Sequence, residues 1–237
     1  MWEQKKGWIV IAVIKTYSVE IQEEILFNVI GINDPLRANE AIVSKVREMI
    51  VLATTLAKPQ VIYEEVEFTV VDEQNLLLAD GQMFTSRYVV KKMTECESIL
   101  VLAMSLGGEL HEQVSELSAK DPFCGYVIDG ISAYMVETLS DLVWQDRKAA
   151  YLKRGKNISI YYAPGVHDFG LENQQVVFDV LKPEQIGIYL NESYLMVPMK
   201  SLSGIIGIGE KVIPVNLGHD CAECDREQCF LREASSC

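Results

Sequence analysis

A long amphipathic stretch, residues 121–154, constrains the fold of this chain more than any other part of its sequence. Its apolar residues recur at intervals of three and four, which is the spacing of one face of an α-helix. Gly155 then ends the stretch, as glycine does at helix C-termini. We interpret the apolar stripe as core packing rather than as a cofactor-binding face. The stripe comprises Val127, Ile128, Ile131, Tyr134, Met135, Thr138, Leu139, Leu142 and Val143.

Short strands alternate with further helices along the rest of the chain. Apolar and acidic residues alternate over residues 61–71, which predicts a half-buried antiparallel strand, and residues 76–78 can return along it. The apolar run 98–104 predicts a buried strand. Other strands are expected at 9–17, 158–162, 186–190, 194–197 and 205–208, and other helices at 21–30, 35–56, 86–93, 109–117 and 171–181. This order predicts an α+β fold, with a curved, mainly antiparallel sheet flanked by helices.

Several prolines and glycines carry local expectations. Pro35 suits the first turn of the helix that it opens. The Gly107-Gly108 pair between a strand and a helix predicts a tight turn, or an anion site at the helix start. It lacks the lysine of a phosphate-binding loop. The glycines of the last strand are expected to loosen it.

The formal net charge of −13 excludes several classes of function. The densest basic cluster, residues 153–156, is too small to neutralise a nucleic-acid backbone or an anionic membrane. No run approaches the roughly 18 apolar residues of a membrane span. We therefore expect a cytoplasmic protein, whose acidic surface serves solubility or docks a less acidic partner.

The cysteines divide the chain into two parts. Four of the six lie at the C-terminus, and this clustering points to metal or redox chemistry rather than to a disulfide framework. We expect a domain at residues 1–217 and a Cys-rich tail at residues 218–237. Cys96 and Cys124, in predicted helices, are expected to be core residues.

Four thiolates in the tail can hold either tetrahedral zinc or an iron–sulfur cluster. Their spacing does not choose between the two, and free thiols at a frayed terminus are the third alternative. His219 can replace the last cysteine as a ligand. The candidate metal ligands are Cys221, Cys224, Cys229 and Cys237.

Several segments, in a fixed order, resemble a known family. Ala163-Pro164-Gly165 follows a predicted strand, where that family has an Arg-x-Ala/Ser-Pro-Gly-Tyr turn. Residues 191–196 resemble its Thr-Glu-Ser segment, and residues 198–207 resemble its Ser-Val-Ser-Gly strand. Residues 29–32, 105–110 and 128–132 are similar to its stand-alone members. The family is the activation (reactivation) domain of cobalamin-dependent methionine synthase, and the resemblance covers roughly residues 20 to 210.

The resemblance implies a role in repairing a cobalt cofactor. Members of the family bind S-adenosylmethionine above the corrin and return its methyl group to oxidised cob(II)alamin, with one electron from a reductase. The domain acts mainly by placing the donor near the metal. Ala163, Pro164 and Gly165 are then the expected cofactor-binding residues. The implied partners are a cobalamin-binding methionine synthase, or another corrinoid protein, and an electron donor.

The chain departs from the family pattern at the donor turn. Tyr161 stands where the family has its arginine, and Val166 where it has a tyrosine. A tyrosine hydroxyl cannot replace the charged fork that arginine offers to a carboxylate. The segment 167–170 does not match the motif that supplies a lower cobalt ligand, so any corrinoid must arrive on another protein.

Two hypotheses follow from the sequence. The first is a methyltransferase component that reactivates a partner-bound cobalamin with S-adenosylmethionine. The rival is a non-enzymatic iron–sulfur electron carrier, or a corrinoid-protein cap, that has lost S-adenosylmethionine binding. A zinc-stapled interaction protein is a third alternative.

Overall fold

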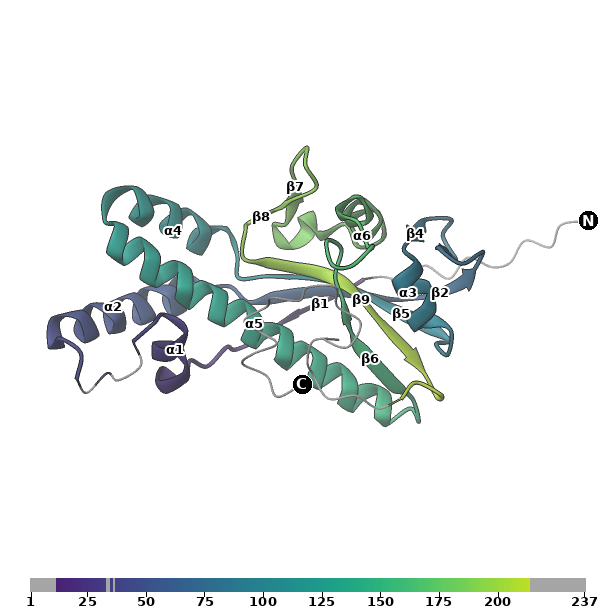
Figure 1. The fold of residues 1–237 in the computed structure, drawn as a ribbon, viewed down its shortest axis with the longest axis horizontal. Helices are drawn as coiled ribbons and strands as arrows, with labels where there is room; N and C mark the ends of the chain where they lie inside the picture. Colours follow the sequence, from purple (N-terminus) through teal and green to yellow (C-terminus); the bar gives the residue numbers. More distant parts are fainter. Residues whose placement is uncertain (1–11, 33–34, 36, 214–237) are drawn as a thin grey trace, which may run out of the picture.

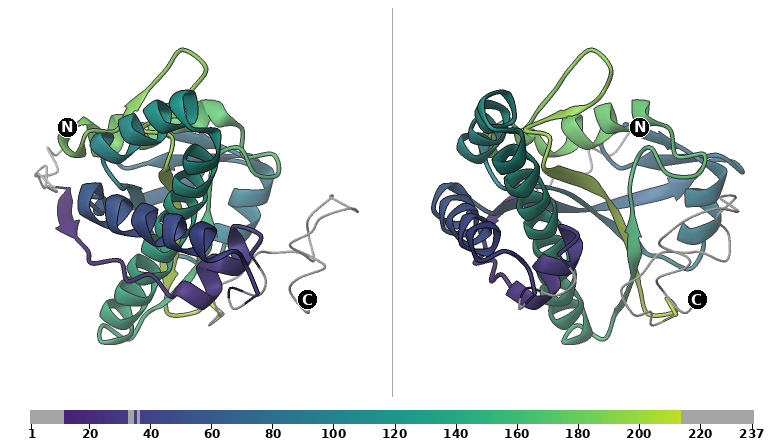
Figure 2. Two further views of the ribbon diagram at one scale, coloured as in Figure 1. Left: turned by 90° about the vertical axis from the view of Figure 1, so that its left-hand side faces the viewer. Right: turned by 60° about the vertical axis from the view of Figure 1, so that its left-hand side comes forward.

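The computed structural model describes residues 12–32, 35 and 37–213, and these residues form an antiparallel sheet between two layers of helices. The sheet has seven strands in the order β4-β3-β2-β5-β9-β6, with β1 also paired to β2. All of its pairings are antiparallel, and the sheet twists along its length (Figures 1 and 2). Its strands are β1 (Val13–Thr16), β2 (Gln60–Val70), β3 (Asn75–Leu78), β4 (Met83–Thr85), β5 (Ser98–Ser105), β6 (Asn157–Tyr162) and β9 (Ser201–Gly209).

Helices cover both faces of this sheet. One layer, which includes the long α5, packs on one face, and α3 and α6 pack on the other (Figure 1). A separate hairpin of two short strands, β7 (Tyr189–Leu190) and β8 (Met196–Val197), precedes β9. The helices are α1 (Glu23–Val29), α2 (Glu40–Leu56), α3 (Arg87–Met93), α4 (Gly108–Lys120), α5 (Pro122–Leu152) and α6 (Gln174–Leu181), with 3-10 turns at Leu171–Asn173 and Pro183–Ile186. The predicted α+β fold is confirmed.

Strand β5 lies at the centre and contributes to both cores. All eight of its residues are buried. Leu100, Leu102 and Met104 enter the core beneath α5, whereas Ile99 and Val101 enter the core beneath α6. Burial on both faces explains why its sequence is a continuous apolar run rather than an alternating one.

The long helix forms as its periodicity predicts. Asp121 caps the N-terminus of α5, where its carboxylate accepts hydrogen bonds from the amides of Phe123 and Cys124, each at 3.1 Å. Much of the predicted stripe is buried, so it is core packing as interpreted. The buried stripe residues are Val127, Ile128, Ile131, Met135, Leu139 and Val143.

The glycines of β9 do not loosen the strand as expected, but allow close packing. A Cβ atom on Gly204 would overlap the carbonyl oxygen of Tyr162, and one on Gly207 would overlap the sulfur of Cys96. A Cβ on Gly209 would come within 2.8 Å of the carbonyl oxygen of Glu95. Here glycine marks positions where neighbouring groups approach the backbone.

Some predicted boundaries are wrong. Helix α2 begins at Glu40, five residues after Pro35, because the side chain of Asn39 caps it by accepting from the amide of Ala41 at 2.9 Å. The predicted strand 186–190 is reduced to β7, because a 3-10 turn occupies Pro183–Ile186. The short strand β4 was not predicted. Within the described ranges, no helix is long and apolar enough to cross a membrane.

Candidate functional site

The predicted donor turn lies at the surface, directly after β6. Pro164 is buried and anchors the turn, whereas Gly165 is exposed with φ +94°, a conformation that favours glycine. The Gly165 amide donates to the carbonyl of Phe169 at 2.6 Å, and the Val166 amide donates to the carbonyl of Ala163 at 3.3 Å. Ala163, Pro164 and Gly165 thus form a closed bend in which Gly165 is exposed, Ala163 is half-buried and Pro164 is buried.

Asp168 fixes this bend to the start of α3. Its carboxylate accepts from the Ser86 hydroxyl at 2.6 Å and from the amides of Arg87 and Tyr88 at 2.9 and 3.1 Å. Burial alone would raise the pKa of Asp168, but these hydrogen bonds offset it and hold the pKa below its ordinary value. The loop therefore keeps its charge and its shape near neutral pH.

Aromatic contacts hold the same loop from two sides. The imidazole of His167 stacks on the ring of Tyr88, with 4.0 Å between centroids and 26° between planes. The ring of Phe169 meets that of Phe84 edge-on at 5.6 Å. Val166, 51% exposed, is left facing solvent next to Gly165. A rigid bend with one outward apolar side chain suits contact with another molecule.

Tyr161 does not join this exposed surface. Its ring lies over Gly204 and packs with the core beneath α5. Its hydroxyl is buried and has no hydrogen-bond partner among the described residues. Burial, and then the nearby charge of Glu137, raises the pKa of Tyr161 well above its ordinary value. The position that corresponds to the family's arginine therefore holds a neutral side chain whose hydroxyl is buried, so it does not fit the carboxylate of a methyl donor.

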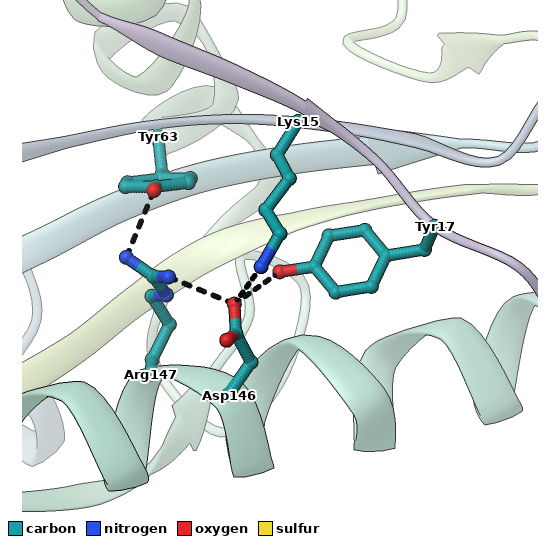
Figure 3. Close-up of polar contacts among 5 residues, drawn as sticks. All are labelled: Lys15, Tyr17, Tyr63, Asp146 and Arg147. Atoms are coloured by element: carbon teal, nitrogen blue, oxygen red, sulfur yellow. Dashed lines mark hydrogen bonds and ion pairs between the residues drawn. The ribbon is translucent and has the colours of Figure 1, made fainter.

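A polar cluster between α5 and the sheet edge was not predicted (Figure 3). One oxygen of Asp146 accepts from Lys15 at 2.6 Å, from Tyr17 at 2.6 Å and from Arg147 at 2.8 Å. The guanidinium of Arg147 also donates to the hydroxyl of Tyr63 at 2.8 Å and lies over its ring. Because the cluster joins β1, β2 and α5, its role is to fasten the edge strand to the long helix.

Electrostatics within this cluster stabilise its charges. Burial alone would raise the pKa of Asp146, but the donors Lys15, Tyr17 and Arg147 hold it far below its ordinary value. Burial and the hydrogen bond to Asp146 raise the pKa of Tyr17. The adjacent Asp146-Arg147 pair in the sequence was the only available signal, and it does not identify partners more than 80 positions away.

Glu65, one of the acidic residues of the alternating segment 61–71, is engaged with Tyr151 of α5 and with Arg154 just beyond the helix. Its carboxylate accepts from Ser98 at 2.7 Å, from Arg154 at 2.8 Å and from Tyr151 at 3.1 Å. Burial would raise the pKa of Glu65, but these donors lower it. The carboxylate is used for packing the helix on the sheet.

The two cysteines inside the fold are unsuited to redox chemistry. Burial, with Glu95 and Glu97 nearby, raises the pKa of the Cys96 thiol to about 11. Burial also raises the pKa of the Cys124 thiol. Both are free thiols. Cys124 is buried in α5 as expected, whereas Cys96 is only half-buried and lies in the turn between α3 and β5, not in a helix.

The predicted metal ligands lie outside the described residues, as does His219. Within residues 12–32, 35 and 37–213, no group of three His, Cys, Asp or Glu side chains is placed to hold a metal ion. The tail, and the domain boundary predicted before it, remain predictions. The ligands concerned are Cys221, Cys224, Cys229 and Cys237.

Comparison with known proteins supports the fold. No protein-family model and no curated protein sequence matches the chain. Among solved structures, the crystal structure of the MetH reactivation domain bound to AdoHcy is similar, with a TM-score of 0.60 and 12% sequence identity. The match covers 84% of this chain and 78% of that chain. The chain therefore has the fold of a methionine synthase reactivation domain, as the resemblance implies.

Proposed function

We propose that this chain reactivates a cobalamin-dependent methionine synthase, or another corrinoid methyltransferase. The cobalamin is bound by that partner protein and not by this chain. The fold carries this proposal: it is shared with a reactivation domain over 84% of the chain, and that domain binds AdoHcy. AdoHcy is what remains of S-adenosylmethionine after its methyl group is transferred. The reaction consumes one electron, which reduces cob(II)alamin to cob(I)alamin, and the methyl group of the sulfonium then passes to cobalt.

The chain itself supplies position rather than acid–base chemistry. The bend of Ala163, Pro164 and Gly165 reaches the surface at Gly165, and the contacts of its loop to α3 and to Phe169 hold its shape. A rigid surface lowers the barrier of a transfer by holding the donor in line with the acceptor. Ala163, Pro164 and Gly165 are the residues proposed to shape the donor site, through backbone groups.

One observation favours the second candidate, a corrinoid-protein cap or iron–sulfur electron carrier that does not bind S-adenosylmethionine. The family's arginine position is the uncharged Tyr161, whose hydroxyl is buried, so a donor carboxylate has no cation there. In this alternative the exposed bend contacts the partner and no methyl donor lies between them. The two candidates differ in whether this chain binds S-adenosylmethionine.

Calorimetry of the full chain with S-adenosylmethionine and with AdoHcy tests the choice. Reactivation with a bound donor predicts saturable binding of both, weakened about tenfold or more in Gly165→Ala, because the new methyl meets Leu171 at 3.1 Å and φ is +94°. Gly155→Ala is the matched control: its φ is +74°, it has no atom within 4 Å of the new methyl, and it lies at the far end of β6. We expect it to bind as the unaltered chain does.

No binding at millimolar donor would rule out the first candidate and leave the cap or electron carrier. Reactivation predicts that the unaltered chain, with S-adenosylmethionine and a reductant, accelerates loss of the cob(II)alamin spectrum of a purified cobalamin-binding methionine synthase. An electron carrier predicts acceleration without the donor, and a cap predicts none. Absence of that effect, with and without S-adenosylmethionine, would reject reactivation altogether.

A further inference from the structure

A small hollow lies between α4, the first turns of α5 and the segment that joins β8 to β9 (these elements are labelled in Figure 1). Its volume is about 240 Å³. Sites for drug-sized molecules usually have roughly 300–1,000 Å³, so this hollow suits a smaller ligand, of the size of a single amino acid. No step of the proposed reactivation uses it.

The floor of the hollow is apolar. Leu106 and Leu110 line it, are each 1% exposed and belong to the core beneath α5. Val114 lines it as well and packs against the same core. Met199, which is exposed, adds a flexible apolar side chain to the lining. A ligand that enters the hollow can therefore bury an apolar group against these side chains.

Two opposite charges line the same hollow. Lys200, just before β9, and Asp129 of α5 form an ion pair at 3.0 Å, and their side chains are 23% and 51% exposed, so solvent reaches both. Of the described residues that line the hollow, these two supply the only ammonium and the only carboxylate, and His111 is the remaining titratable side chain. The hydroxyls of Ser115 and Ser118 donate to carbonyls of their own helix at 3.0 and 2.7 Å, so they offer acceptors without charge.

This combination of charges selects the class of ligand. A phosphate or a dicarboxylate would bring negative charge to Asp129, and a polyamine would bring positive charge to Lys200. A wholly apolar molecule would pair with neither charge, and the end of a polypeptide would pair with only one. A free α-amino acid carries an ammonium and a carboxylate on one carbon atom, and an apolar side chain on that carbon matches the floor.

We propose that the hollow binds a free α-amino acid with an apolar side chain. The ammonium of the ligand pairs with Asp129, its carboxylate pairs with Lys200, and its side chain lies on the apolar floor. Binding exchanges one ion pair within the chain for two with the ligand, and burial of the apolar side chain adds to the affinity. This inference goes beyond the proposed function and does not depend on it.

Calorimetry of the full chain with L-leucine and with L-methionine tests the proposal. We expect saturable binding with a Kd of about 10 µM to 1 mM, because so small a ligand makes few contacts. N-acetyl-L-leucine lacks the ammonium and L-leucinamide lacks the carboxylate. Each should bind about tenfold or more weakly than L-leucine, because one charge of the site is left without its partner.

Substitution of the two charged residues locates the site. Asp129→Asn and Lys200→Gln should each weaken binding of L-leucine about tenfold or more, because one charge of the ligand loses its partner. The matched control is Glu116→Gln, which removes an ion pair to Lys120 at 3.3 Å on α4, and neither of these residues lines the hollow. Ion pairs that solvent reaches contribute little to stability, so all three variants should remain folded, which urea unfolding checks.

Three results would overturn the proposal. Binding of neither amino acid at millimolar concentration rejects the site, and L-leucine binding that is unchanged in Asp129→Asn and Lys200→Gln places it elsewhere. Equal binding of L-leucine and its two blocked analogues rejects the ligand class. Loss of S-adenosylmethionine binding in the same two variants would assign the hollow to the methyl donor instead. Because the amino-acid titrations use neither cobalamin nor its carrier protein, their failure would leave the proposed reactivation intact.

Discussion

Gly204 shows at the scale of a residue what sequence patterns leave out. The strand that holds it was expected to be loosened by its glycines, yet Gly204 lies against the Tyr162 carbonyl oxygen and under the ring of Tyr161. The absence of a side chain lets β6 and the covering residues approach β9. A glycine is needed for close packing only where residues distant in sequence approach its backbone, and a sequence pattern does not show where that happens.

Gly204→Ala is therefore expected to destabilise the chain by about 1–3 kcal/mol, the usual cost of overpacking a filled interior. The added methyl would overlap the Tyr162 carbonyl oxygen, which is backbone and cannot rotate away. Urea unfolding measures the change. Gly108→Ala is the control, because nothing lies within 4 Å of its new methyl and alanine favours the helix that it begins. Equal stabilities for the two variants would show that Gly204 is not a packing requirement.

The position of the donor bend could be predicted from the sequence, whereas the orientation of Tyr161 could not. Ala163, Pro164 and Gly165 were expected at the end of a strand, and they form a turn there in which Gly165 is exposed and Pro164 is buried. The direction of Tyr161 was not predictable, because β6 shifts register against β9 between Ile158 and Tyr161. This irregularity places both residues on the α5 side of the sheet, although regular alternation would put them on opposite sides.

At the scale of an element, the cluster around Asp146 decides how β1 is attached. Strand β1 pairs with β2 over only four residue pairs, and Val13 and Ile14 are exposed. Lys15 and Tyr17 tie its end to Asp146 of α5. Such polar contacts add to the limited backbone pairing at a sheet edge, and they make the attachment sensitive to protonation.

Asp146→Asn should lower the free energy of unfolding by about 1.5–3 kcal/mol at neutral pH, the usual contribution of hydrogen bonds to a charged group. The folded-state pKa of Asp146 lies below its ordinary value, so its contribution is present above about pH 4 and is lost as the pH falls toward the folded value. Thermal unfolding across pH 3–7 should show the two proteins converging in acid.

Asp141→Asn is the control on the same helix. Burial raises the pKa of Asp141, so its charged form is disfavoured by folding and its replacement should not lower stability at neutral pH. A difference between Asp146→Asn and the unaltered chain that stays constant with pH would show that the ionisation of Asp146 is not what stabilises the edge strand.

Most helices and strands were predictable, because the spacing of their apolar residues follows which side of the element is buried. The alternating β2, the uniformly apolar β5 and the striped α5 match their expected positions within a few residues. The failures are short elements: β4 has three residues and β7 has two, and such lengths hold no periodic signal. The start of α2 was misplaced because a proline signal was preferred over the capping side chain of Asn39.

At the scale of the whole molecule, the central strand β5 is buried on both faces, and helices pack on each side of the sheet. The bend after β6 is bonded to the start of α3, whereas α4 and the hollow beside it belong with the helices that cover the other face. If the bend holds a methyl donor as proposed, the acceptor must be supplied by another molecule.

The proposed reactivation consumes one electron, and the Cys-rich tail is the part of the chain from which we expect it to be delivered. We expect the anaerobically purified chain to contain an iron–sulfur cluster, with about two or four irons and matching sulfide per chain. Zinc at about one per chain would instead indicate a structural staple. Metal and sulfide analysis distinguishes them, with visible absorption as a second readout.

Substitution identifies the ligands of that site. Cys224→Ser and Cys229→Ser should each lose most of the metal, because a four-thiolate site tolerates few replacements. Cys96→Ser is the matched control, since Cys96 packs against Gly207 inside the fold and its raised pKa disfavours the thiolate that binds metal. If the tail variants keep their metal, the ligands lie elsewhere. If the unaltered chain carries no metal at all, the electron must come directly from the reductase, and the chain contributes position alone.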